Sequence, residues 1–553
     1  MKTIKKILCL LPLSITLMTG CESFTDINNS VSTVYEVDPL TFLYKVQERN
    51  QGAGSTWTDS YACKLRWLQY CSNIWGYSTT NFTYFSSSIG SDLYSEWLDM
   101  GGYATHIEYY ISKNMPEELP KYSNLIEVAR ILLINKGIAT TDMHGSLAYT
   151  EGWGLRRGRP ELENPKFDTQ EELFTIWDQE LKTAIEKLST ATDQVSLAGY
   201  DMAFKGDVSK WIKTANALRL RIALRMLKRN ETKAKEIAAE VLKSSIPAST
   251  EAGVIIKFDK LYTNNGDWHS VIDMDRASAP FMRYLKTYND PRKRIYFRIN
   301  NLTSENIAQY NSEQSDPEKL IPADFTQWEG GTVSYDERKT DKRYFSRTLK
   351  DGTDMRAMNQ PQVRLWKGMY DNGSGGSWFP NLTYADFCFM ASEFSLLGVS
   401  NAKSAQQWYE EGVAASLKQW SAMGEYCKIY EYEPITDAEI NDFLSQPGIA
   451  WNAANALEQI YCQSWVEHYK NTNEAWALWR RTGYPNQTST IVTFDKVMIN
   501  GEEQTVPRRT RFAYPAEGTP NKANMIDRIE KMAADVEFGE IQNEFGRLWW
   551  DKK

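Results

Sequence analysis

Residues 206–226 of this chain read GDVSKWIKTANALRLRIALRM. Apolar side chains recur here at spacings of three and four residues, which places them on one face of a helix; they are Trp211, Ala215, Leu218, Ile222 and Met226. Basic residues, Arg221 and Arg225 among them, fall off this stripe. The segment therefore predicts an amphipathic helix that buries one face against a neighbour.

The residues before this segment show the same periodicity. A second apolar stripe consists of Leu173, Trp177, Leu181, Ala184 and Leu188. Asp168, followed three residues later by Glu171, matches the capping box, in which two side chains bond the backbone N–H groups that a helix leaves unpaired at its start. We therefore predict a helix that begins directly after Asp168.

A pair of helices is predicted over residues 384–420. The first stripe runs from Tyr384 to Phe394 and ends before Gly398, a residue that commonly terminates helices. The second includes Tyr409, Val413, Leu417 and Trp420, and its small residues Gly412, Ala415 and Ser416 allow a neighbouring helix to approach. The short connection between the two stripes predicts an αα-hairpin.

These patterns predict a mainly α fold built from helical hairpins. Such pairs are typical of tetratricopeptide-like units of about 34 residues, although the full repeat consensus is absent. The helical scaffold covers about residues 40–250 and 380–553, and a loop-rich, ligand-facing insertion covers about residues 250–380. Short strands are expected at 254–258 and 491–494. We expect one body over residues 21–553.

Composition excludes several classes of protein. The 553 residues are 42% hydrophobic and 13% aromatic, which is too apolar for a disordered chain. The net charge is −8 and no run of Lys or Arg occurs. Phosphate recognition needs clustered positive charge, so we expect no nucleic-acid partner.

The first 20 residues are typical of a lipoprotein signal peptide. Lys2, Lys5 and Lys6 precede the apolar segment 7–18, and small residues come directly before Cys21. The apolar segment is shorter than the roughly 20 residues that a membrane-spanning helix needs. This pattern predicts export. Its resemblance to a bacterial lipobox implies cleavage before Cys21 and acylation of Cys21, with the lipid as the only membrane contact; a secreted protein with an incidental Cys21 is the alternative.

The remaining cysteines are scattered and contain no C-x-x-C motif. They are Cys63, Cys71, Cys388, Cys427 and Cys462. We expect most to be small buried hydrophobic residues. Whether Cys63 and Cys71 form a disulfide bridge is a question that the sequence leaves open.

Catalytic motifs are scarce. The four histidines form no H-E-x-x-H pair, and neither a G-x-S-x-G elbow nor a phosphate-binding glycine loop occurs. We therefore expect a non-enzymatic protein with no cofactor and no catalytic metal, and we leave bound Ca²⁺ open. A glycosidase needs only two carboxylates brought together, and Asp273 and Asp275 near His269 are one such pair; a solvated polar loop is the simpler interpretation.

Aromatic residues in polar loops are the candidate ligand contacts. A ring among amides and carboxylates can stack on the apolar face of a sugar or pack on a peptide side chain. The alternative is that each ring plugs its loop onto the helical body. The candidates are Trp75, Tyr77, Trp268, Trp328, Trp366 and Trp378.

Several ordered segments resemble the SusD/RagB family of surface lipoproteins, in the SusD-like, starch-binding-associated branch. They are 141–151, which resembles an Asp-x-x-Gly-x-x-Pro-Tyr-x-Glu turn, 206–221, Asp290-Pro291-Arg292, the 384–420 hairpin, 457–485 and Trp549-Trp550-Asp551. Two positions depart from the pattern: Ala148 replaces the usual Pro, and residues 26–30 lack the usual Asn-Pro-Asn.

The resemblance implies an outer-membrane, cell-surface lipoprotein with a tetratricopeptide-like body. Such a protein binds a nutrient, most often a glycan or oligosaccharide, and delivers it as a lid to a SusC-like TonB-dependent transporter. The same architecture with a peptide ligand is the alternative. A surface hydrolase with paired carboxylates is the third hypothesis.

Overall fold

The computed structural model describes residues 37–50, 63–73, 90–244, 246–247, 254–258, 275–344, 347–367, 376–399 and 402–553, with the backbone alone for 254–258, 367 and 377. Four candidate residues therefore lie outside the described residues; they are Cys21, Trp75, Tyr77 and Trp268. The signal peptide lies outside them as well.

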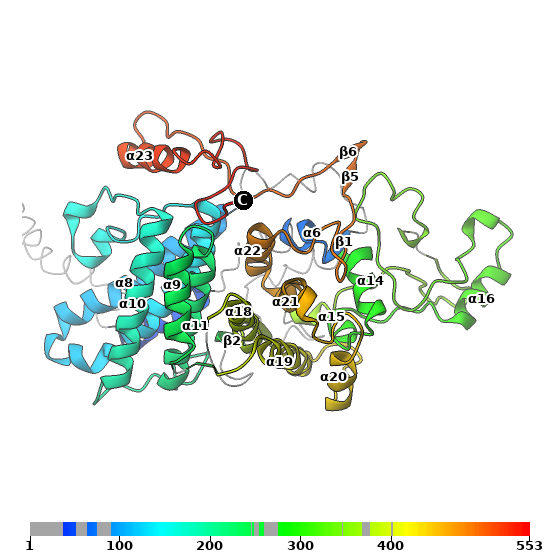
Figure 1. The fold of residues 1–553 in the computed structure, drawn as a ribbon, viewed down its shortest axis with the longest axis horizontal. Coiled ribbons are helices and arrows are strands. Elements are labelled where there is room, and N and C mark those ends of the chain that lie inside the picture. The colour runs from blue at the N-terminus through cyan, green and yellow to red at the C-terminus, as the bar shows by residue number, and fades with distance from the viewer. Residues whose placement is uncertain are drawn as a thin grey trace, which may run out of the picture.

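The N-terminal half is a bundle of long helices, on the left of Figure 1. They are α4 (Leu40–Asn50), α8 (Ser91–Asn114), α9 (Ser123–His144), α10 (Gln170–Thr190), α11 (Val208–Met226) and α12 (Glu231–Val241). Helix α9 contacts α4, α8, α10 and α11 and is buried along most of its length. A helix covered on several sides needs apolar residues around its circumference, which α9 has.

The apolar stripes predicted for α10 and α11 are confirmed, because every member is buried. The predicted helix start is wrong by one residue. Thr169, which has an extended backbone, caps α10: its hydroxyl accepts from the Glu172 N–H, and the Glu172 carboxylate accepts from the Thr169 N–H. Asp168 is left to bond the backbone N–H groups of Tyr149 and Thr150 at 3.0 and 2.9 Å.

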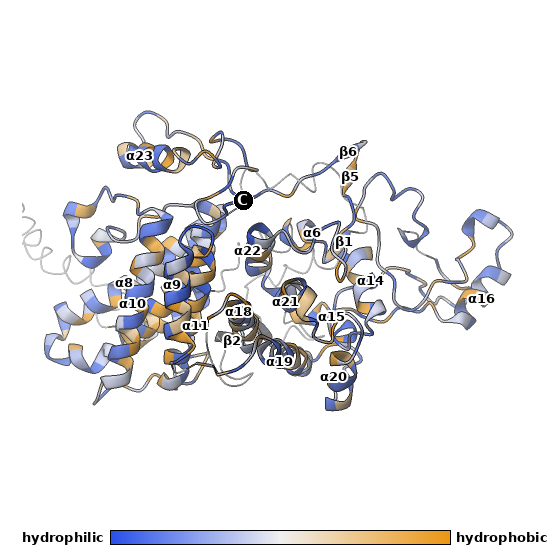
Figure 2. Ribbon diagram, viewed as in Figure 1, coloured by the Kyte–Doolittle hydropathy of each residue, from blue (hydrophilic) through white to orange (hydrophobic). Residues whose placement is uncertain are grey.

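The predicted αα-hairpin is confirmed as α18 (Tyr384–Leu396) and α19 (Ala405–Tyr426), in the centre of Figure 1. Gly412 marks the point of closest approach. A Cβ atom added there would lie 2.8 Å from the Phe389 ring and 3.0 Å from Cys388 Cβ. Beyond this pair lie α20 (Asp437–Leu444), α21 (Ala456–Glu467) and α22 (Thr472–Thr482). The N-terminal bundle and these later helices share one hydrophobic core. The helices of the bundle carry hydrophilic and hydrophobic residues on different faces (Figure 2).

The segment between the two helical parts has short elements joined by long loops. Its helices are α14 (Ala279–Thr287), α15 (Lys293–Tyr296), α16 (Ser304–Ser312) and α17 (Arg364–Lys367). A separate small core lies under its outer loops and includes Leu302, Ile307, Ile321 and Met355. The loops of this segment are therefore packed on one another as well as on the helical body.

Strands are few and short among the described residues. They are β1 (Cys71–Asn73), β2 (Val254–Phe258), β3 (Asp275–Ala277), β4 (Ser377–Leu382), β5 (Met498–Ile499) and β6 (Glu502–Glu503). Each belongs to an antiparallel pair, β1 with β3, β2 with β4 and β5 with β6. The strand predicted at 254–258 is confirmed, whereas 491–494 is not a strand and forms one isolated bridge, at Thr493. The prediction of a mainly α fold with a few short strands is confirmed.

The C-terminal segment returns to the N-terminal half. Helix α23 (Lys522–Ala533) is followed by a loop that buries Trp550 completely. The guanidinium groups of Arg225 and Arg480 lie 5.2 and 4.6 Å from the Trp550 ring centroid. Asp551 accepts from Arg508 at 2.6 Å. None of the described helices is long and apolar enough to cross a membrane.

Candidate functional site

One of the predicted aromatic residues, Trp328, lines a surface pocket with a volume of about 230 Å³. The pocket lies between the α14–α15 turn and α20, in the right half of Figure 1. Its other lining residues are Tyr288, Asn289, Asp290, Pro291, Lys293, Arg294, Glu439, Asp442, Phe443 and Gln446.

The α14–α15 turn is held by a buried ion pair. Asp290 and Arg292 are both buried and lie 2.6 Å apart, and Arg292 also donates to Ser416 of α19 and Gln463 of α21. Because this pair anchors the turn to the central helices, it fixes the positions of Tyr288 and Lys293 at the pocket wall.

Arg294 holds α20, which forms the opposite wall of the pocket, in place. Its guanidinium donates to the Pro434 carbonyl at 2.9 Å and forms an ion pair with Glu439 at 2.9 Å. Burial acts to raise the pKa of Glu439, but the hydrogen bonds from Arg294 and Thr436 outweigh it and lower the pKa. Glu439 is therefore a charged acceptor that holds α20 against α15.

Trp328 supplies the aromatic surface. Its side chain is half-buried, and Lys293 Nζ lies 5.0 Å from the ring centroid. Burial lowers the pKa of Lys293. The side chains of Asn289, Lys293 and Asp442 form no hydrogen bond to another described residue. An indole ring beside such donors and acceptors is suited to a ligand with both apolar faces and polar groups.

The structure places Trp366 and Trp378 in the interior, as the alternative interpretation of these candidate ligand contacts predicts. Both side chains are buried in the main core. The Trp366 ring packs edge-on against Tyr469 at 5.0 Å, and the Trp378 ring packs edge-on against Tyr426 at 5.9 Å. These two rings plug their loops onto the helical body and are not brought together with Trp328 in its pocket.

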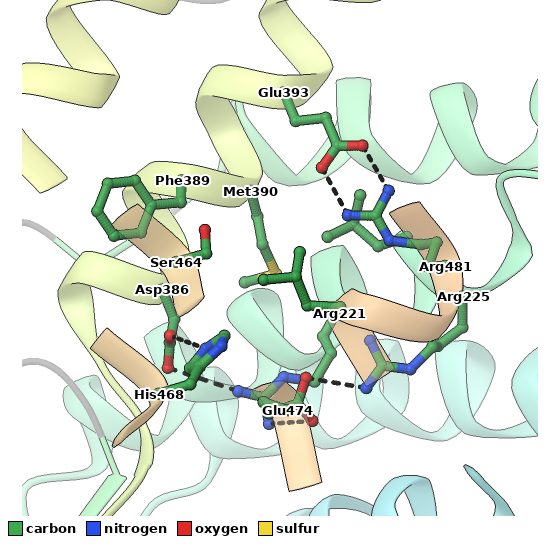
Figure 3. Close-up of a pocket in the computed structure, with 12 residues that line it drawn as sticks. Arg221, Arg225, Asp386, Phe389, Met390, Glu393, Ser464, His468, Glu474 and Arg481 are labelled. Carbon is green, nitrogen blue, oxygen red and sulfur yellow. Dashed lines mark hydrogen bonds and ion pairs between the residues drawn. The ribbon is translucent and has the colours of Figure 1, made fainter. Parts of the chain in front are cut away.

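A second cluster of charged residues lies at a buried cavity of about 40 Å³ between α11, α18, α21 and α22 (Figure 3). His468 Nε2 lies 2.5 Å from Asp386, and Arg225 lies 2.8 Å from Glu474. Burial acts to raise the pKa of Glu474, but Arg221 and Arg225 lower it to about 2. The cavity has room for only a few water molecules, so this cluster joins helices and does not fit a nutrient.

The remaining sequence candidates have structural roles or lie outside the described residues. His269 and Asp273 belong to the undescribed part of the chain, while Asp275 is fully buried and ion-paired with Arg66 at 3.0 Å. The five described cysteines are buried thiols, so the Cys63–Cys71 bridge is not formed. No group of three or more His, Cys, Asp or Glu gathers as a metal site among the described residues.

Sequence reasoning missed most of the pocket around Trp328. Tyr288 and Lys293 flank the Asp290-Pro291-Arg292 segment, and that segment was a signal available in the sequence. The contribution of α20, through Asp442 and Gln446, has no comparable signal, because it depends on how two distant segments pack.

Comparison with known proteins covers almost the whole chain. A family model described as "SusD-like_2: Starch-binding associating with outer membrane" matches residues 33–515. A search of curated proteins finds no match to the sequence.

Three solved structures with the same fold are similar to this chain. A chitin-binding protein is 21% identical, covers 93% of this chain and 100% of its own, and has a TM-score of 0.71. A SusD homolog from Bacteroides fragilis is 19% identical, with 93% and 100% covered and a TM-score of 0.67. A chitin-binding SusD homolog from Flavobacterium johnsoniae is 21% identical, with 93% and 99% covered and a TM-score of 0.63. The chain belongs to the SusD/RagB family, in its SusD-like, starch-binding-associated branch.

Proposed function

We propose that this protein binds a glycan or oligosaccharide at the outer membrane and delivers it, as a lid, to a SusC-like TonB-dependent transporter. Membership of a family described as starch-binding and outer-membrane-associated supports a nutrient-binding role. Two of the similar structures are named as chitin-binding proteins. The lipidated Cys21 would hold the body at the cell surface, and binding would involve no chemical step.

The observation that carries the glycan proposal is the Trp328 pocket. It places a half-buried indole ring beside the polar side chains of Asn289, Lys293 and Asp442, on a wall fixed by the Asp290–Arg292 ion pair. Stacking of a sugar ring on the indole would remove apolar surface from water, and the polar side chains would bond the hydroxyl groups. Trp75, Tyr77 and Trp268 remain proposed contacts of the same ligand.

Calorimetry of the purified protein against oligosaccharides and oligopeptides tests this proposal. We expect a saccharide to bind and Trp328→Ala to weaken its binding by about 1–3 kcal/mol, by analogy with the stacking of a nucleic-acid base on an aromatic side chain. Tyr514→Ala is the matched control, because this tyrosine is 52% exposed and lies outside the pocket. An unchanged affinity in Trp328→Ala, with unaltered thermal stability, would reject the pocket as the site.

The other outcomes separate the alternatives. A peptide ligand whose affinity falls in Trp328→Ala would move the protein to the peptide-binding hypothesis. New reducing ends after incubation with a polysaccharide would favour the hydrolase hypothesis. Cys21→Ser is expected to release the folded protein from the membrane fraction, and retention there would place the anchor elsewhere.

A further inference from the structure

A second surface pocket of about 230 Å³ lies in the helical half, among α8, α9, α10 and the loop that follows α9. These helices are at the left of Figure 1, away from α20 and the Trp328 pocket. The lining residues are Ala104, Thr105, Glu108, Ile126, Arg130, Leu133, Tyr149, Thr150, Trp153, Arg157 and Glu180.

The aromatic wall of this pocket is held rigidly. Trp153 has a φ of 56°, a left-handed conformation that residues with a side chain rarely adopt. Its Nε1 donates to the Leu98 carbonyl at 2.6 Å, and its ring packs against Trp97 at 4.7 Å. A Cβ atom on Gly101 would lie 2.0 Å from the ring, so only glycine allows this approach. Strained residues of this kind are concentrated at binding sites.

The loop that carries the second aromatic residue is also fixed. Asp168 bonds the N–H groups of Tyr149 and Thr150, and the Tyr149 hydroxyl donates to Glu180. The Tyr149 ring is packed edge-on against Trp177 at 5.6 Å. The pocket is therefore formed before any ligand binds.

The charged groups of the pocket balance one another and have unused hydrogen-bonding capacity. Two guanidinium groups, Arg130 and Arg157, face two carboxylates, Glu108 and Glu180. Within the described residues, the Glu108 carboxylate forms neither a hydrogen bond nor an ion pair, and Arg130 makes only an ion contact with Glu127 at 3.6 Å. Burial raises the pKa of Glu180 despite the Tyr149 hydrogen bond and the Arg130 charge.

We propose that this pocket is a second binding site, for a single neutral sugar ring or a polyol of that size. Hydroxyl groups both donate and accept, so neighbouring hydroxyls bond a guanidinium and a carboxylate together, and the Trp153 ring packs on the apolar face. Equal numbers of positive and negative groups favour a neutral ligand. The volume of about 230 Å³ lies below the roughly 300–1,000 Å³ of sites for drug-sized ligands and accommodates one ring inside the pocket.

The test is a titration of the purified full-length protein with millimolar D-glucose, D-galactose, D-mannose and N-acetyl-D-glucosamine. Binding is measured by the change in tryptophan fluorescence and by calorimetry. At least one sugar is expected to bind. Glu108→Gln and Arg130→Met are each expected to weaken it about tenfold, the effect of losing one hydrogen bond to a charged group. Glu186→Gln, an exposed change on the same helix as Glu180, is expected to leave the affinity unchanged.

The two sites are distinguished by testing the variant of each pocket with the ligand of the other pocket. Trp328→Ala is expected to leave monosaccharide binding intact, and Glu108→Gln is expected to leave oligosaccharide binding at the Trp328 pocket intact. The proposal is overturned if no sugar of the panel binds, or if monosaccharide binding survives Glu108→Gln and Arg130→Met but is lost in Trp328→Ala. Binding of free amino acids, and of none of the sugars, that depends on Arg130 would show a zwitterion site and would equally overturn it.

Discussion

At the scale of single residues, His144 at the end of α9 couples stability to pH. Its Nε2 lies 2.8 Å from the Gly90 carbonyl, which can only accept, so Nε2 carries a proton. Burial, assisted by the charge of Arg528, lowers the pKa of His144 to about 3 despite the Gly90 hydrogen bond. The folded protein therefore resists protonation of this ring.

The expected pH dependence follows from linkage. An unfolded chain binds a proton at His144 below a pH of about 6.5, and the folded chain does so only below a pH of about 3. This contribution to stability is complete above pH 6.5 and is lost as the pH falls towards 3, by at most about 1.4 kcal/mol per pH unit. His144→Gln is expected to flatten the fall of Tm between pH 6.5 and 4.5. Parallel curves for the two proteins would contradict the assignment.

The sequence alone could not predict which of the tryptophans in the loops are buried. Trp366 and Trp378 stand beside a glycine-rich stretch, and their neighbours in sequence suggested exposure. Their neighbours in space are Tyr469 and Tyr426, which come from helices later in the chain. Trp328, in a loop of the same character, reaches the surface, and its sequence context holds no signal that separates the three.

At the scale of helical elements, close packing at Gly412 makes a sharp prediction. Gly→Ala in a helix normally stabilises a protein by roughly 0.5–1 kcal/mol. At Gly412 the added methyl group meets the Phe389 ring of α18 at 2.8 Å, whereas Gly102 of α8 has no atom within 4 Å of the added group. Gly412→Ala is therefore expected to lower the free energy of unfolding by about 1–3 kcal/mol, and Gly102→Ala to raise it.

Urea denaturation of the two variants measures this difference. Both changes gain the same helix propensity. The difference between their effects on the free energy of unfolding therefore measures the contact of the added methyl group with α18. Equal stabilisation of both proteins would mean that α18 and α19 are packed less closely than described.

Periodicity predicted the existence of the helices better than their ends. The stripes of α10, α11, α18 and α19 were visible because apolar spacing is a local property of the sequence. Choosing Thr169 over Asp168 as the cap required the backbone of the preceding loop, which turns Asp168 towards Tyr149 and Thr150. Similarly, 491–494 has the composition of a strand, but among the described residues it forms a single bridge, between Thr493 and Asn486.

At the scale of the whole molecule, buried ion pairs join the two helical parts. Arg225 of α11 bonds Asp142 of α9 at 2.9 Å and Glu474 of α22 at 2.8 Å. From sequence, Arg221 and Arg225 were simply residues off the apolar stripe; their burial arises because α11 is covered on a second face as well. Single-helix patterns cannot reveal this second contact.

Removing one member of this network is expected to be costly. Glu474→Gln leaves Arg221 and Arg225 without their shared carboxylate, and unfolding should require about 3–5 kcal/mol less free energy. Asp527→Asn provides the control, since its ion pair with Lys531 is about half exposed and such pairs contribute about 0–1 kcal/mol. Chemical denaturation of both variants checks the contrast, and similar losses would contradict a buried network.

The burial of Trp550 has a consequence for biosynthesis. Its ring lies between Arg225 and Arg480, and Asp551 bonds Arg508. Trp550 and Asp551 are translated after the three arginines that they contact. A nascent chain that stops before residue 549 therefore leaves the guanidinium groups of Arg225 and Arg480 uncovered, so the helical bundle reaches its final packing only after residues 549–551 have been synthesised.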